Sequence, residues 1–141
     1  MAEQDLWGEI TLKKIETPKD ILIEQANAFN NKFEGKLMCE LKEGYQELDP
    51  WDSLVTSPTE KEQKFLLKFY LSAPSLNKYK LLMLKVSYFA TKIYPCELEN
   101  NMAEVSTLDK CKNSDEFKEN LKKILNSENV TDAISNLYVQ L

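Results

Sequence analysis

The sequence predicts an α+β domain, in which helices pack on a mainly antiparallel sheet of four to five strands. Three observations favour this fold. Segments that alternate apolar and polar residues, as half-buried strands do, occupy the middle of the chain. Apolar residues with helical spacing lie on either side of that region. A chain of 141 residues can also bury its own core, so we expect one domain over residues 1–141.

The N-terminal part of the chain predicts one strand followed by one helix. Residues 6–15, LWGEITLKKI, predict a first strand whose apolar parity holds Leu6, Ile10 and Leu12. A helix is expected from the capping residue Thr17, which precedes Pro18, to Gly35, a residue that commonly ends helices. The apolar stripe of this helix consists of Leu22, Ala26, Phe29 and Phe33.

The middle of the chain predicts four further strands. They are expected at residues 36–48, 63–74, 79–88 and 92–98. Residues 49–62 contain two prolines and several turn formers, which indicates a loop. Residues 74–77 predict the turn of a hairpin. Pro95 lacks an amide hydrogen, so we expect its strand to lie at a sheet edge.

One or two C-terminal helices complete the predicted fold. The polar segment before residue 113 is interpreted as a connection, and Asn113 to Glu116 resemble a helix start. The first helix is expected to bury Phe117, Leu121, Ile124 and Leu125. After an interruption at NSENV, residues 126–130, a second helical face consists of Val130, Ile134, Leu137 and Tyr138.

The composition restricts the catalytic chemistry of the chain. It has no histidine, the usual general base near neutral pH and the commonest metal ligand. All 18 basic residues are lysine, so no guanidinium group is present to bind carboxylate or phosphate in a bidentate manner. Its three glycines form no phosphate-binding loop. We therefore expect a non-enzymatic protein without cofactor or metal.

Cysteine usage and hydropathy predict a cytoplasmic protein. Cys39, Cys96 and Cys111 are an odd number and include no C-x-x-C pair, which is typical of reduced, buried thiols. The first ten residues are acidic and lack the apolar core of a signal peptide. No apolar run approaches the roughly 20 residues that span a bilayer, so we expect no membrane partner.

One acidic segment is a candidate for enzymatic chemistry. In QELDPWDSL, Glu47, Asp49 and Asp52 surround Trp51. Paired carboxylates beside an aromatic ring can perform acid–base catalysis or hold a metal ion. The same residues are also ordinary turn formers, and a turn is the interpretation that we favour.

The central hairpin is the candidate partner surface. In YKLLMLKVSYFATKIYP, residues 79–95, both parities are mostly apolar, so both faces of the strand need cover. Residues 61–95 hold seven lysines against one acid, whereas the rest of the chain is acidic. The cover could be a second helical layer, an oligomeric contact or a ligand. The candidate surface consists of Leu66, Lys68, Tyr70, Leu81, Met83, Lys85 and Phe89.

Two functions follow from this hairpin. The first is a macromolecule-binding or self-associating protein, with another protein or a second copy as its partner. The alternative is a domain that binds a ligand or single-stranded nucleic acid through the lysine and aromatic side chains. A pI near 4.9 and the absence of arginine argue against nucleic acid.

Four segments resemble small bacterial proteins of unknown function. They are TPKDILIEQANAF (17–29), FYLSAPSLNKYKLLML (69–84), IYP (93–95) and SDEFKENLKKILNSENV (114–130). The resemblance covers most of the chain, and its motifs are structural. It implies a single domain in a bacterial protein of the cytoplasm, and it carries no activity and no site residues. The macromolecule-binding hypothesis is of a small bacterial or mobile-element protein.

Overall fold

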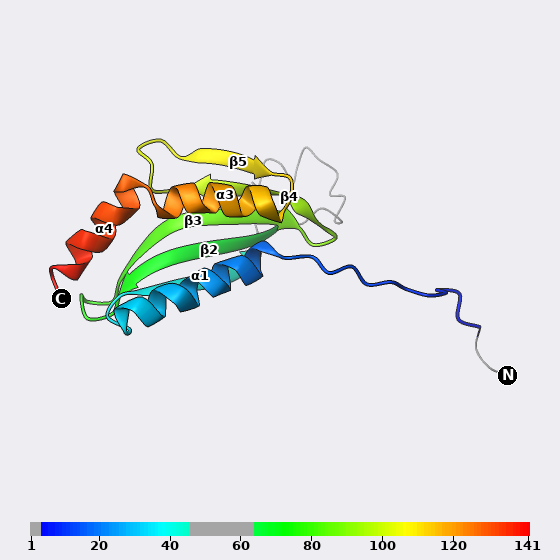
Figure 1. Cartoon of the computed structure of the whole chain (residues 1–141), viewed down its shortest axis with the longest axis horizontal. Coiled ribbons are helices and arrows are strands. Elements are labelled where there is room, and N and C mark those ends of the chain that lie inside the picture. Colours follow the sequence, from blue (N-terminus) through cyan, green and yellow to red (C-terminus); the bar gives the residue numbers. More distant parts are fainter. Residues whose placement is uncertain (1–3, 46–63) are drawn as a thin grey trace, which may run out of the picture.

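The computed structural model describes residues 4–45 and 64–141 of the chain (Figure 1). The elements are α1 (Pro18–Phe33), β1 (Met38–Tyr45), β2 (Lys64–Ala73), β3 (Tyr79–Phe89), β4 (Lys92–Asn100), β5 (Thr107–Cys111), α3 (Ser114–Leu125) and α4 (Glu128–Tyr138). The strands form one antiparallel sheet in the order β1-β2-β3-β4-β5. The predicted α+β class and the antiparallel sheet are therefore confirmed.

The prediction of a first strand at residues 6–15 is wrong. These residues form an extended segment that projects away from the body of the protein and belongs to no ladder of the described sheet (Figure 1). Leu6 and Leu12 are each 85% exposed. An alternating pattern shows that a segment suits a strand, but a strand also needs a neighbour that accepts its hydrogen bonds. In the described structure, α1 is consequently the first element and precedes β1.

The position of β4 within the sheet also differs from the prediction. The segment interpreted as a connection contains β5, which pairs with β4, so β4 is an inner strand. Four of the five β5 residues are exposed, and the strand therefore lacks an apolar alternation that would have revealed it. Pro95 is tolerated because it lies between Lys92 and Glu97, where the β3–β4 pairing is interrupted.

Local sequence signals set the helix ends as predicted. The Thr17 hydroxyl accepts a hydrogen bond from the Asp20 amide at 3.1 Å and caps α1. Gly35 follows α1 with a φ of +81°, a conformation that glycine adopts without steric cost. The Asn113 side chain accepts a bond from the Glu116 amide at 2.9 Å and caps α3.

The helices pack on one face of the sheet. Helix α1 packs against β1, and α3 packs against β4 and β5 on the same side (Figure 1). The largest fully buried side chains between the two layers include Leu22, Leu37, Leu67, Phe69, Leu71, Leu84, Val86, Leu98 and Phe117. Among the described elements, no helix covers the opposite face, which we call the open face. No described helix has the length and apolar character needed to cross a membrane.

A β-bulge in the middle of β3 explains why its sequence is apolar on both parities. Phe69 of β2 lies opposite Leu84, whereas the next residue, Tyr70, lies opposite Leu82. Met83 is therefore an extra residue in β3, and the side chains on either side of it change parity. Residues directly opposite each other in a ladder share a face, so Leu82 lies with Tyr70 on the open face.

The bulge corrects the predicted partner surface. Leu81 lies opposite the buried Leu71 and faces the helices. Met83 is only 2% exposed. It lines a cleft together with Phe29 and Leu125, so its side chain also lies on the helix side of the sheet. These two residues are consequently part of the protein's own packing and leave the candidate surface.

The bulge predicts unequal effects of neighbouring alanine substitutions. Met83→Ala should lower the free energy of unfolding by about 2–5 kcal/mol, because it removes a buried core side chain. Leu82→Ala should lower it by about 1 kcal/mol or less, because Leu82 lies on the half-exposed open face. Urea unfolding followed by circular dichroism measures both values. Equal losses, or a larger loss for Leu82→Ala, would contradict the bulge assignment.

Candidate functional site

The open face carries three lysines in a line across three strands. Lys42 of β1 lies directly opposite Lys68 of β2, and Lys68 lies directly opposite Lys85 of β3. Neighbouring strands are about 4.8 Å apart, so this lysine row spans roughly 10 Å. Like charges placed directly opposite each other destabilise a sheet. The row is therefore expected to lower folding stability, so its presence needs an explanation other than stability.

Carboxylates offset only part of this positive charge. On the open face Lys85 pairs with Glu99 at 3.8 Å, and Lys80 pairs with Glu40 at 2.7 Å. Within residues 4–45 and 64–141, no ion pair involves Lys42 or Lys68. The β1 and β2 members of the row thus give the described open face a local excess of positive charge.

A groove of about 490 Å³ lies along the lysine row. Leu66 and Tyr70 flank Lys68 on β2 and supply its apolar surface. Gly44 lies opposite Leu66 at the edge of the sheet, and no heavy atom lies within 4 Å of the place where its Cβ would be. The missing side chain leaves the groove open at β1. We call this feature the open-face groove.

The two aromatic rings of the open face already contact lysines. The Lys42 ammonium lies 5.5 Å from the centre of the Tyr70 ring, and the Lys64 ammonium lies 5.1 Å from the centre of the Phe89 ring. Both distances are typical of cation–π contacts. Each ring therefore has one face occupied by a cation of the same chain, and that face is not free to stack on a planar ligand.

The sequence located most of this surface and missed part of it. Five residues of the candidate partner surface lie on the open face, namely Leu66, Lys68, Tyr70, Lys85 and Phe89. Sequence reasoning missed Lys42 and Gly44. Both come from β1, and the sequence between β1 and β2 holds no signal that aligns Lys42 with Lys68.

The acidic candidate falls outside the described part of the chain. Glu47, Asp49, Trp51 and Asp52 all belong to the interval between residues 45 and 64. In the described ranges, no group of three or more cysteine or carboxylate residues is arranged to hold a metal ion. The assignment of these residues to enzymatic or metal chemistry stays a sequence-based hypothesis.

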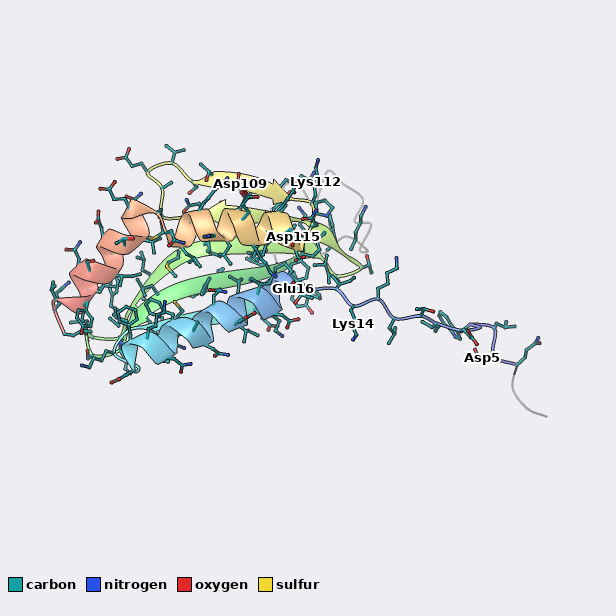
Figure 2. All side chains as sticks on the ribbon, in the orientation of Figure 1. Asp5, Lys14, Glu16, Asp109, Lys112 and Asp115 are labelled. Carbon is teal, nitrogen blue, oxygen red and sulfur yellow. The ribbon has the colours of Figure 1, made fainter. Side chains whose placement is uncertain are left out.

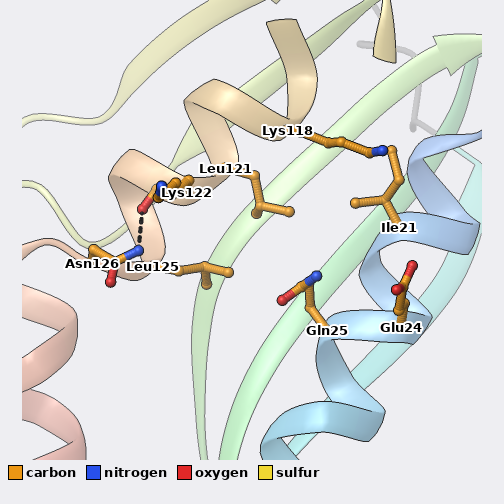
Figure 3. Close-up of a pocket in the computed structure, with 8 residues that line it drawn as sticks. All are labelled: Ile21, Glu24, Gln25, Lys118, Leu121, Lys122, Leu125 and Asn126. Atoms are coloured by element: carbon orange, nitrogen blue, oxygen red, sulfur yellow. Dashed lines mark hydrogen bonds between the residues drawn. The ribbon is translucent and has the colours of Figure 1, made fainter. Parts of the chain in front are cut away.

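A second groove lies between the two main helices. It has a volume of about 360 Å³ and takes its apolar surface from Ile21 of α1 and from Leu121 and Leu125 of α3 (Figure 3). Two of the polar groups that line it are engaged within the chain: the Asn126 amide donates to the Lys122 carbonyl at 2.8 Å, and Lys118 pairs with Glu16.

The three cysteines are buried free thiols. Burial raises the pKa of Cys39 to about 12. Cys96 lies opposite Cys111 in the β4–β5 ladder. A hydrogen bond with Cys111, together with burial, raises the pKa of Cys96, whereas hydrogen bonds from Cys96 and the Asn120 amide lower that of Cys111. All three side chains belong to the core between sheet and helices, and none of them lines the open-face groove.

Comparisons with known proteins do not extend this description. No protein-family model, curated protein or solved structure matches the chain. The resemblance to small bacterial proteins therefore stays a prediction, and the functional argument depends on the geometry of the open face.

The lysine row predicts that one lysine can be removed with a gain in stability. Lys68→Gln should raise the free energy of unfolding by about 0.5 kcal/mol, because it removes the central charge of the row. Lys80→Gln is the matched control and should lower it by a few tenths of a kcal/mol, because Lys80 pairs with Glu40. Urea titrations should show the Lys68→Gln gain shrink in about 0.5 M salt. A loss of stability for Lys68→Gln would contradict a repulsive row.

Burial of Cys39 predicts a loss of stability at alkaline pH. An ordinary thiol, as in the unfolded chain, has a pKa of 9.0, whereas the folded thiol has one of about 12. The unfolded state therefore releases its proton first, and stability falls as pH rises from 9 toward 12. Relative to Cys39→Ala, the wild type should lose about 2 kcal/mol by about pH 10.5. Parallel denaturation curves for the two proteins across this range would contradict the prediction.

Proposed function

We propose that this chain is a non-enzymatic, macromolecule-binding protein of the cytoplasm, and that its open-face groove binds an acidic segment of another protein. The lysine row is the observation that carries this proposal. Lys42, Lys68 and Lys85 come from three strands, and the row weakens the free protein. An arrangement that lowers stability at a surface groove is typical of a binding site.

Charge complementarity defines the chemistry of the partner. Carboxylates seated along the row would pair with Lys42 and Lys68, for which the described structure records no ion pair. Binding would replace repulsion between lysines by attraction to the ligand. Leu66 and the exposed part of Tyr70 supply apolar contact beside the charges. The preferred partner is therefore an acidic protein segment that also carries apolar side chains.

Two other occupants fit this groove less well. A second copy docked face to face would bring one lysine row near another, which is repulsive. A single-stranded nucleic acid would need aromatic rings for its bases to stack on, and lysines occupy one face of both the Tyr70 and Phe89 rings.

Binding of an acidic polypeptide tests the proposal directly. Fluorescently labelled poly-L-glutamate is titrated with the full chain at about 50 and 300 mM salt, and anisotropy reports binding. We expect binding at low salt that weakens at high salt. Replacing all three lysines of the row by glutamine should weaken it at least tenfold. Lys32, Lys36 and Lys123, exposed and off the open face, are replaced by glutamine in the charge-matched control, which should bind within about threefold of the wild type.

A second variant tests the groove without changing charge. Gly44→Val adds a side chain where no neighbour lies within 4 Å, so the fold should tolerate it while the groove is filled. We expect poly-L-glutamate binding to fall about tenfold. An equal loss of poly-L-glutamate binding in the row variant and in the charge-matched control would contradict a localised site. Tighter binding of a 20-nucleotide oligo-dT than of poly-L-glutamate would assign the groove to nucleic acid instead.

A further inference from the structure

The N-terminal arm, residues 4–15, exposes large apolar side chains that the described structure does not use. It projects from the body of the protein, with Asp5 and Lys14 along its length (Figure 2). The exposed fractions are 85% for Leu6, 81% for Trp7, 63% for Ile10, 85% for Leu12 and 51% for Ile15. Five such residues within ten positions are unfavourable in water, which indicates that the arm is buried in an assembled form.

The arm has the sequence of a strand but no partner strand. Leu6, Ile10 and Leu12 share one parity, as the apolar face of a strand requires. Residues 4–15 nevertheless take no part in the ladders of the described sheet. An extended segment of about ten residues reaches roughly 33 Å, which is enough to cover a strand of another molecule. The arm is therefore suited to β-augmentation, in which an extended segment adds to a sheet edge.

The root of the arm is anchored to β4 and α3, the two elements that contact β5. The Tyr94 hydroxyl on β4 donates to the Glu16 carbonyl at 2.7 Å, and Lys118 on α3 pairs with the Glu16 carboxylate at 2.7 Å. Both β4 and α3 contact β5. Strand β5 also runs toward the end of the molecule from which the arm leaves (Figure 1). Two molecules that meet at their β5 edges would thus each hold an arm root close to the edge of the other.

The two edges of the sheet differ in how open they are. At β1, the Asn30 side chain accepts a hydrogen bond from the Cys39 amide at 2.8 Å, and Lys19 forms an ion pair with Glu43. Because Asn30 and Lys19 belong to α1, this helix occupies part of the β1 edge. Side chains that cap an edge in this way prevent another strand from pairing. At β5 a side-chain cap of this kind is found only beyond the strand, where the Glu116 carboxylate accepts a hydrogen bond from the Lys112 amide at 2.6 Å, and Leu108 within the strand is 62% exposed. The β5 edge is therefore the better acceptor.

We propose that the arm of one molecule pairs as an added strand with the β5 edge of a second copy, and that the exchange is reciprocal. Each molecule then donates one arm and accepts one, which closes a two-fold symmetric dimer and leaves neither β5 edge unpaired. Apolar residues of the arm lie against Leu108 at that edge. Leu108 is not among the residues that line the open-face groove, although it lies opposite Glu99, the ion-pair partner of Lys85.

Sedimentation velocity of the full chain tests the exchange. Between about 1 and 200 μM, the wild type should shift from its monomer mass of 16.4 kDa toward twice that value. Ile10→Lys combined with Leu12→Lys should weaken dimerisation at least about a hundredfold, because both arms lose two apolar contacts. Thr11→Pro should also weaken it, because proline removes an amide hydrogen that a paired strand uses while the apolar residues stay.

Matched substitutions at the two edges identify the acceptor. Leu108→Lys should abolish dimerisation, whereas Tyr45→Lys, at a residue of the β1 strand that is 58% exposed, should leave it unchanged. Val139→Lys, at an exposed apolar residue far from the arm in sequence, is the control for the arm variants. At about 1 μM, where the wild type is monomeric, thermal melting should be unchanged in the arm variants, because the side chains they replace are exposed in the monomer. A wild type that stays monomeric at 200 μM, or a dimer insensitive to the arm or Leu108 substitutions, would overturn the proposal.

Discussion

Burial of a single face of the sheet is the constraint on which the described structure depends. Helices α1 and α3 cover that face, and the fully buried apolar side chains of β2, β3 and β4 lie on it. Strand β3 meets this requirement only through the bulge at Met83, which lets Leu81 and Leu84 both face the helices despite their different parity. The bulge thus keeps a continuous core beneath two helices.

The open face is free of this packing requirement and has a different composition. Its lysines and glutamates form cross-strand pairs such as Lys64 with Glu97, which keep a partly apolar surface compatible with water. The lysine row departs from this balance, because its charges repel one another across three strands. We propose that an acidic partner offsets this repulsion, and the same repulsion disfavours association of two open faces.

We propose that an edge of the sheet gives the protein a second route to assembly. An isolated sheet edge presents backbone groups that pair readily with another strand. Asn30 limits such pairing at β1, whereas β5 stays accessible in the described structure. The open-face groove and the β5 edge would therefore serve different partners, an acidic protein and a second copy, without competing for the same residues.

The sequence alone determined the features that depend on neighbouring residues: the caps at Thr17 and Asn113, the alternation of β2 and the hairpin that follows it. Because a short turn joins β2 to β3, the sequence also predicted that Lys68 and Lys85 lie on one surface. The tertiary structure decided which parity of β3 is buried, where β5 lies, that the arm has no partner strand, and that Lys42 completes the row. Those features depend on strand register and helix packing between segments distant in sequence, so no local sequence pattern predicts them.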